Sequence, residues 1–249
     1  MTAWLLDLDG VVWLAGTAIP GSPEAVTRLL DAGIDVCFAT NFSYAAVGEA
    51  EAKLARIGID GRGRVLSSAM AAATLVQPDD TVLVCGGPGI VEAVLARGAT
   101  VVREGDADVV IVGYDPEFDY RKLTVAVSAV RAGARFVATN EDPTFPTPTG
   151  LLPGGGSLVA AVAYASQRTP EVAGKPHQPF ADLVRARSGP EGIMVGDQSL
   201  TDGGLARRLG YRFGLVLSGV TGPDQVPTDP APDVVAADLA SLVAAELGV

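Results

Sequence analysis

The sequence predicts an α/β fold: a Rossmann-like, doubly wound parallel sheet with a second α/β unit inserted into it. Short runs rich in Val, Ile and Leu alternate with Ala-rich stretches of helical period, and this alternation is typical of parallel strands joined by crossover helices. The chain has 249 residues and is 48% hydrophobic and 19% charged. This composition excludes a disordered or fibrous protein and suffices for one to two domains with a large buried core.

The outer parts of the chain carry the pattern of the main sheet. Each apolar run is followed by a turn and then by a helical pattern, and glycines at 33, 58 and 210 stand where helices commonly end. The expected strands are 3–8, 35–40, 192–195, 212–216 and 234–235, and the expected helices are 23–32, 44–57 and 201–209.

The middle of the chain repeats the pattern as a separate unit. Polar, proline-bearing stretches at 77–80 and 168–170 flank it and are typical of hinges. We therefore expect a core domain formed by 1–77 and 171–249, with 78–170 inserted into it. The expected strands of the insert are 81–85, 108–113 and 135–139, and its expected helices are 89–97, 120–132 and 157–165.

Charge and cysteine content limit the partners and the compartment. The chain has 18 Lys and Arg against 29 Asp and Glu, a net charge of −11, so it repels nucleic acid. We expect neither a signal peptide nor membrane association, because Asp7 and Asp9 interrupt the first apolar run and no apolar stretch reaches the roughly 18 residues of a membrane span. Cys37 and Cys85 lie within apolar runs, as buried free thiols do, which favours a reducing cytoplasm.

Two carboxylates follow the first expected strand. Asp7 and Asp9 are two residues apart and precede a glycine, at the end of the strand where open α/β sheets bind ligands. If the strand stays extended, both side chains share a face, and two close negative charges require a cation or a raised pKa. A solvated Asp-Gly turn explains the same residues equally well when they are taken alone.

Two further places are suited to binding an anion. Thr40 and Asn41 end the second expected strand just before an expected helix, and backbone N–H groups at a helix N-terminus attract anions. Taken alone, this segment is more often a helix cap. Lys175 stands between Gly174 and Pro176, which fix it in a defined loop, although surface lysines are usually only solvated.

A second pair of carboxylates follows the strand expected at 192–195. Asp197 and Asp202 offer hard oxygen ligands, and together with Asp7 they would form an all-oxygen site suited to Mg²⁺. The alternative for Asp202 is that it caps the next helix.

The order and spacing of these groups closely resemble the four motifs of the haloacid dehalogenase (HAD) superfamily of phosphohydrolases. Along the chain they read Asp-x-Asp-Gly-Val, Thr-Asn, a single Lys after the insert, and Gly-Asp-x-x-x-Thr-Asp. Residues 138–146 and 152–156 are similar to the cap loop of the NagD/4-nitrophenylphosphatase branch. The resemblance runs essentially end to end and implies a HAD-like core with a C2-type cap.

The resemblance also implies a role for each motif residue. Asp7 would be the nucleophile that forms an aspartyl phosphate, and Asp9 the general acid and base. Mg²⁺ would bind the Asp7 carboxylate, the Asp9 backbone carbonyl and Asp197. The phosphoryl oxygens would be held by Thr40, by the Asn41 backbone and by Lys175. Asp202 would orient Lys175 or a metal-bound water.

The resemblance further implies a Mg²⁺-dependent phosphatase for a small phosphorylated metabolite, with Asn140, Asp142 and Phe145 of the cap near the substrate and with a homodimer formed through the cap. Phe145 stands where pyridoxal phosphate phosphatases of this branch carry histidine, which favours small aliphatic or nucleotide phosphates. Gln198 and Leu200 depart from the family pattern, so residues around the metal ligands differ from those of relatives. A phosphotransferase of the same fold and a non-catalytic binding protein are the alternatives.

Overall fold

The computed structural model describes residues 3–14, 16–147 and 150–248. The chain divides into two compact units, which we call the core unit (Met1–Thr40, Gly48–Leu66 and Lys175–Val249) and the inserted unit (Asn41–Val47 and Ser67–Gly174). By their contacts, 41–47, 67–77 and 171–174 belong to the inserted unit, in addition to the expected 78–170. The domain bounds expected from the sequence stay a prediction.

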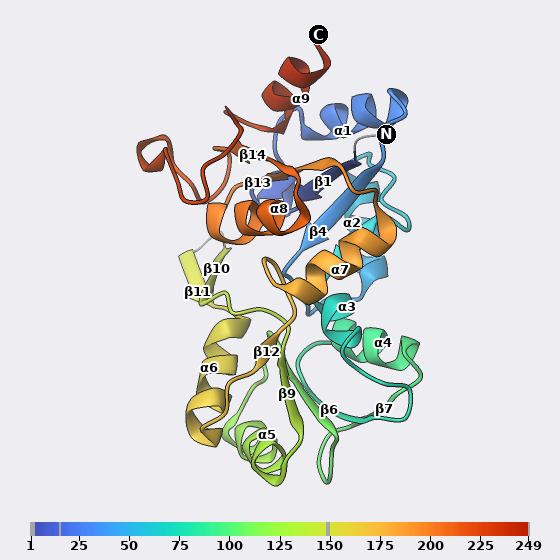
Figure 1. The fold of residues 1–249 in the computed structure, drawn as a ribbon, viewed down its shortest axis with the longest axis vertical. Helices are drawn as coiled ribbons and strands as arrows, with labels where there is room; N and C mark the ends of the chain where they lie inside the picture. Colours follow the sequence, from blue (N-terminus) through green and yellow to red (C-terminus); the bar gives the residue numbers. More distant parts are fainter. Residues whose placement is uncertain (1–2, 15, 148–149, 249) are drawn as a thin grey trace. The chain divides into compact units, whose positions relative to one another are not determined.

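The core unit is built on a six-stranded sheet in the order β15-β14-β13-β1-β4-β5 (Figure 1). The strand β1 lies between β13 and β4 and is parallel to both, so the strand order reverses beside it, which is where doubly wound sheets place their ligands. The strands are β1 (Ala3–Asp7), β4 (Val36–Thr40), β5 (Val65–Ser67), β13 (Gly192–Gly196), β14 (Arg212–Val216) and β15 (Val234–Ala236).

Helices of the core unit pack in pairs, α1 with α9 and α7 with α8 (Figure 1). The helix expected at 201–209 is preceded by a π-helical turn, Ser199–Gly203, and the α-helix itself is shorter. A small hairpin of β2 (Trp13–Leu14) and β3 (Thr17–Ala18) follows β1. The helices are α1 (Ser22–Asp31), α2 (Val47–Arg56), α7 (Gln178–Arg187), α8 (Gly204–Leu209) and α9 (Leu239–Leu247).

The inserted unit has its own sheet, in the order β12-β9-β8-β6-β7, and all four pairings are parallel. Alternate residues of its strands, such as Leu83 with Cys85 and Val110 with Val112, pack against apolar residues of α5 and α6, as the period of two of a strand requires. Its strands are β6 (Thr81–Cys85), β7 (Thr100–Val102), β8 (Val109–Val112), β9 (Arg135–Ala138) and β12 (Glu171–Val172), with the hairpin β10 (Thr144–Thr147) and β11 (Gly150–Pro153).

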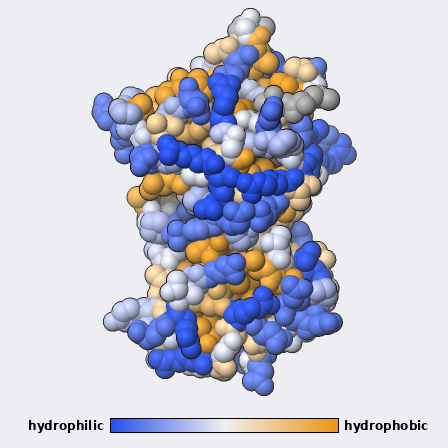
Figure 2. All heavy atoms as spheres, viewed as in Figure 1, coloured by the Kyte–Doolittle hydropathy of each residue, from blue (hydrophilic) through white to orange (hydrophobic). Residues whose placement is uncertain are grey.

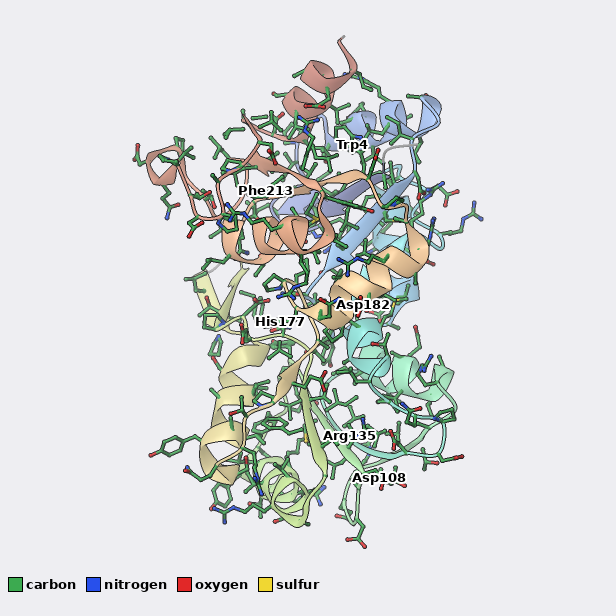
Figure 3. All side chains as sticks on the ribbon, viewed as in Figure 1. Trp4, Asp108, Arg135, His177, Asp182 and Phe213 are labelled. Atoms are coloured by element: carbon green, nitrogen blue, oxygen red, sulfur yellow. The ribbon has the colours of Figure 1, made fainter. Side chains whose placement is uncertain are left out.

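The helices described for the inserted unit are α3 (Ser68–Ala73), α4 (Pro88–Ala96), α5 (Tyr120–Ala132) and α6 (Gly155–Ser166). Specific contacts explain why segments outside 78–170 belong to it. Arg135, labelled in Figure 3, donates to the Leu75 carbonyl at 2.6 Å and to the Asp80 carboxylate at 2.5 Å. The Tyr44 carbonyl accepts from Gly89 N at 2.8 Å, and this bond occupies a group that the helix expected at 44–57 would use, so α2 begins only at Val47.

The viewed face mixes hydrophilic and hydrophobic residues in both units (Figure 2). Within the described ranges, no helix combines the length and the apolar character that crossing a bilayer requires. Cys37 and Cys85 are buried free thiols, as the sequence predicts. Burial raises the pKa of the Cys85 thiol to about 12, so this thiol is protonated and unreactive at neutral pH.

Candidate active site

Three neighbouring strands of the core unit end in polar residues at one edge of the sheet. In the parallel register Leu6 pairs with Val195 and Asp7 pairs with Ala39. Asp7 therefore lies level with the ends of β4 and β13, where Thr40 is the last residue of β4 and Asp197 directly follows β13. Since the carboxyl ends of parallel strands meet at the same edge, residues far apart in sequence are brought together there.

A buried lysine connects two of the carboxylates. Lys175 Nζ lies 2.8 Å from Asp7 Oδ1 and 2.7 Å from Asp202 Oδ1, and it donates to the Ala39 carbonyl at 3.2 Å. The exposed fractions are 2% for Lys175, 8% for Asp7 and 0% for Asp202. Asp202 also accepts from Gln198 N at 3.1 Å through Oδ2. It therefore holds the lysine and the π-helical turn.

Asp197 lies beside Asp7, Lys175 and Asp202, and the backbone closely surrounds its carboxylate. Its Oδ2 accepts from Val220 N at 2.6 Å, and its own carbonyl accepts from the Thr221 hydroxyl at 2.5 Å. A Cβ at Gly10 or at Gly219 would overlap the Asp197 carboxylate, so only glycine permits this close approach at either position.

The negative charge of Asp7, Asp197 and Asp202 favours the binding of a cation at this place. Oxygens of Asp7, Asp197 and Asp202 lie within 4.8 Å of one another, all buried. Asp197 Oδ1 is buried without a hydrogen-bond partner among the described residues. Three carboxylates against one lysine leave an excess negative charge, and an all-oxygen donor set suits Mg²⁺ or Ca²⁺. The residues therefore fit a hard divalent ion.

The pKa values of Asp7, Asp197 and Lys175 are shifted by burial and by the same excess of negative charge. Burial raises the pKa of Asp7 well above its usual range, against the opposing effect of Lys175. Burial, together with the charge of Asp202, raises the pKa of Asp197 to about 7. Burial alone lowers the pKa of Lys175, but the carboxylates of Asp202 and Asp7 outweigh it and raise that pKa above its usual value. The lysine thus stays charged.

Asp9 has a different environment from Asp7. Its Oδ1 accepts from Trp13 Nε1 at 3.0 Å, and Lys53 Nζ lies 4.0 Å from the centroid of the Trp13 ring. Although Asp9 is exposed, desolvation by the surrounding protein raises its pKa, against the opposing effects of Lys53 and Trp13. Of the two carboxylates of the Asp-x-Asp motif, one is thus paired with lysine and the other with an indole.

The remaining predicted residues lie in the inserted unit or at its border. Thr40 is the buried last residue of β4 in the core unit, and Asn41 is the first residue of the inserted unit. Asn140 Nδ2 donates to the Asn41 carbonyl at 2.8 Å, and Asn41 Nδ2 donates to Asp142 Oδ2 at 3.0 Å. The structure thus brings Asn140 and Asp142 to Asn41.

Phe145 belongs to an aromatic group within the inserted unit. Its ring centroid lies 4.9 Å from that of Tyr114 in an edge-to-face arrangement. Phe42 and Tyr44 extend the group, with ring centroids 6.1 and 5.8 Å from that of Tyr114. Sequence reasoning about single motifs did not find this group, because its members come from three separate segments of the chain: Phe42 and Tyr44 after β4, Tyr114 after β8, and Phe145 in β10.

Several residues of the site lie outside the sequence motifs. Trp13, Lys53 and Gly219 were not singled out in the sequence, and only the closeness of Trp13 to Asp9 could have drawn attention to it. The sole histidine, His177, is the N-cap residue of α7 (Figure 3).

Comparisons with known proteins agree with this geometry. Residues 4–100 match the model of the haloacid dehalogenase-like hydrolases, and residues 172–242 match a second HAD-hydrolase-like model. The acid sugar phosphatase of Staphylococcus haemolyticus is 33% identical over 225 residues, which cover 88% of this chain and 86% of that protein. The chain belongs to the haloacid dehalogenase-like hydrolase family. Within it, the chain is a phosphatase of the NagD/p-nitrophenyl phosphatase-like branch, whose members carry a C2 cap.

Two further relatives cover most of the chain. The 5'-nucleotidase YutF of Bacillus subtilis is 34% identical over 233 residues, 91% of both proteins. The glycerol phosphate phosphatase of Mycobacterium tuberculosis in complex with magnesium superimposes with a TM-score of 0.88 at 33% identity, covering 96% of this chain and 75% of that one. The latter is also known in complex with calcium. The HAD core and the inserted α/β cap expected from the sequence are thus confirmed.

Proposed function

We propose that this HAD phosphatase hydrolyses a small phosphomonoester with Mg²⁺, through an aspartyl phosphate formed on Asp7. One observation carries the proposal: Asp7 shares a buried lysine with Asp202, beside an Asp197 oxygen that has no hydrogen-bond partner among the described residues. Metal-assisted phosphoryl transfer needs a nucleophile held in place and a carboxylate oxygen that can bind the metal. Here the Lys175 ammonium holds Asp7, and Asp197 Oδ1 has no hydrogen-bond partner among the described residues.

In this reaction Asp7 Oδ2 attacks phosphorus, because Oδ1 is held by Lys175. The bond between phosphorus and the ester oxygen breaks, and Asp9 donates a proton to the departing alkoxide. Asp9 then removes a proton from water, which attacks the phosphorus and breaks its bond to Asp7. Inorganic phosphate leaves, and both carboxylates regain their starting states.

The Asp7 carboxylate, the Asp9 backbone carbonyl and Asp197 are proposed to hold Mg²⁺. When bound, the ion supplies positive charge that stabilises the phosphoryl group during transfer. Thr40, the Asn41 backbone and Lys175 are proposed to bind phosphoryl oxygens, and Asp202 is proposed to orient Lys175. The hydrogen bond of 2.7 Å between Lys175 and Asp202 supports the last assignment.

The leaving group is proposed to lie near Asn140, Asp142 and Phe145 of the cap. The relatives are phosphatases of sugar phosphates, nucleotides and glycerol phosphate, which supports a small phosphorylated metabolite as substrate. We further propose that the protein acts in the cytoplasm, as its buried free thiols favour, and that it forms a homodimer through the cap.

Phosphate release from a panel of small phosphomonoesters, with Mg²⁺ or with EDTA, tests the proposal for the wild type and Asp7→Asn. Turnover that needs Mg²⁺ and is lost in the variant is the expected result. Transfer of phosphate to an added alcohol in place of water would indicate a phosphotransferase. Mg²⁺ binding without turnover of any ester would indicate a binding protein and contradict the proposal.

A further inference from the structure

We propose that Trp13 is a positioning residue for Asp9: its indole N–H holds Asp9 Oδ1, so that the proton exchanged in the reaction is carried by Oδ2. The inference rests on the proposed function, in which Asp9 is the general acid and base. It adds a residue that none of the four motifs contains.

The geometry of the segment from Leu8 to Trp13 favours this role. Trp13 is 3% exposed and donates from Nε1 to Asp9 Oδ1 at 3.0 Å. The backbone closes around the same segment, since Gly10 N donates to the Trp13 carbonyl at 2.7 Å and Trp13 N donates to the Leu8 carbonyl at 3.1 Å. Gly10 adopts a φ of +84°, which permits this tight closure. The indole and the carboxylate are thus held together by main chain and side chain.

The chemistry of the two groups assigns the proton to one oxygen. An indole nitrogen is a donor only, so the atom it meets must accept. In a neutral carboxyl group, the carbonyl oxygen is the better acceptor and the other oxygen carries the hydrogen. With Oδ1 bonded to Trp13, the Asp9 proton resides on Oδ2, and the hydrogen bond fixes the plane of the carboxyl group.

Lys53 of α2 fixes the other side of the indole. Its Nζ lies 4.0 Å from the ring centroid, a cation–π distance at which the ammonium attracts the ring face. The lysine is half-buried, so it restrains the ring and brings a positive charge toward Asp9. Lys53 therefore supports the same orientation, with a smaller effect than the direct hydrogen bond.

A purely structural role for the bond is the competing explanation, because a buried indole N–H usually finds an acceptor. The two explanations differ in how the loss of the N–H affects different substrates. A positioned acid matters most for an alkoxide leaving group, which must be protonated as it departs. It matters least for 4-nitrophenolate, which departs as the anion.

The test is Trp13→Phe, which keeps an aromatic ring for Lys53 and removes the donor. We would measure kcat/KM for a series from 4-nitrophenyl phosphate to simple alkyl phosphates, because kcat/KM reports steps up to departure of the leaving group. A fall of about 10-fold or more is expected for alkyl phosphates, against about 2-fold or less for 4-nitrophenyl phosphate. Trp4→Phe is the matched control, since Trp4 is also buried in the core unit at 5% exposure and should not alter the ratio between substrates.

An equal loss across the series, or a lowered melting temperature with an unchanged substrate ratio, would overturn the inference. If Trp13→Phe fails to fold, benzothienylalanine at position 13 replaces the N–H by sulfur and keeps the ring shape, with the same expected ratio. Lys53→Met should change the ratio in the same direction and by less.

Asp9→Asn separates this inference from the proposed function. If Asp9→Asn shows the leaving-group dependence and the Trp13 variants do not, only the role of Trp13 fails. If Asp9→Asn shows none, the roles of Asp9 as general acid and of Trp13 as its positioning residue both fall, whereas Asp7→Asn tests the phosphatase reaction independently.

Discussion

The core unit and the inserted unit each contain their own parallel sheet covered by helices. The two sheets differ in the charge of the residues at their strand ends. In the core unit, β1 ends in Asp7 and β13 is followed by Asp197, which is 1% exposed. In the inserted unit, β9 is followed by Thr139 and Asn140, which are buried and uncharged. The architecture creates an edge where residues meet, whereas the residue types at that edge decide whether it can do phosphoryl chemistry.

The difference also affects stability. Thr139 and Asn140 make neutral hydrogen bonds with the segment that begins at Asn41, so burying them leaves no net charge. In the core unit, three buried carboxylates, Asp7, Asp197 and Asp202, lie beside a single lysine, Lys175. Burying this excess of negative charge is favourable only when a cation binds or protons are taken up. We therefore expect the stability of the core-unit site to depend on ligand and pH, whereas the buried pair Thr139 and Asn140 of the inserted unit is neutral.

The largest expected effect is on turnover. Asp7→Asn should reduce kcat by at least about 10³-fold, because an amide oxygen is a poor nucleophile toward phosphorus. Asp115→Asn in the inserted unit, at a residue that is also 8% exposed, is the matched control and should keep kcat near the wild-type value. Phosphate release under saturating substrate distinguishes the two, and similar losses in both variants would contradict the contrast between the units.

Removal of the buried lysine should cost stability. Lys175→Met leaves the Asp7 and Asp202 carboxylates without their cation, so the free energy of unfolding in EDTA should fall by about 3–5 kcal/mol. Arg121→Met removes the partner of Glu104 in the inserted unit, where the two side chains are 69% and 72% exposed, and should cost about 1 kcal/mol or less. Urea denaturation of both variants measures the difference, and equal losses would show that burial of the charges is not decisive.

The metal-free protein should lose stability as the pH rises. The pKa of Asp197 is raised to about 7 from its ordinary 3.8, so between these values the folded state binds more protons than the unfolded state. The free energy of unfolding should then fall from about pH 4 to pH 7, by at most about 1.4 kcal/mol per pH unit. Since Mg²⁺ competes with these protons, the rise in melting temperature caused by Mg²⁺ should grow between pH 5 and pH 8.

Thermal melts in EDTA and in Mg²⁺ check this dependence on pH. Asp197→Asn should abolish the Mg²⁺-induced rise, whereas Asp115→Asn should leave it unchanged. A rise that is independent of pH would contradict the assignment of Asp197 as a ligand.

The smallest expected effect concerns the inserted unit. Asn140→Ala removes the donor to the Asn41 carbonyl and the acceptor for Asp142 N at 3.2 Å, which should cost about 1–2 kcal/mol of stability. If the Asn41 backbone binds phosphate as proposed, KM should rise by a few-fold with kcat less affected. Thr124→Ala on α5, at an exposed hydroxyl, is the control, and an unchanged KM in Asn140→Ala would separate this residue from phosphate binding.

Much of the sheet could be predicted, because a strand buried on both faces is visible as a short apolar run. The strands at 81–85 and 212–216 have their expected bounds. The short β5 and α3, and the helix α7, were not expected. In α7 the buried Phe180, Ala181 and Val184 do follow helical spacing, but flanking prolines and glycines made the stretch resemble a loop.

The chemical nature of the site was determined by the sequence alone. An Asp-x-Asp after a strand, a Thr-Asn after the next strand, a single Lys and a second Gly-Asp are local patterns, and residues directly after parallel strands must meet at one edge of the sheet. The resemblance of these patterns to the HAD motifs implies the family and the phosphatase chemistry, and the comparisons confirm both.

Only the tertiary structure decided which atoms pair. It assigned Lys175 to Asp7 and Asp202, left Asp197 Oδ1 without a hydrogen-bond partner among the described residues, and set Trp13 against Asp9. These pairings cannot be predicted from local sequence patterns. Each depends on burial and on close approach of the backbone, either between segments far apart in sequence or within a tight turn around a glycine. Burial is also what raises the pKa values of these carboxylates, since desolvation arises only when the surrounding segments have packed.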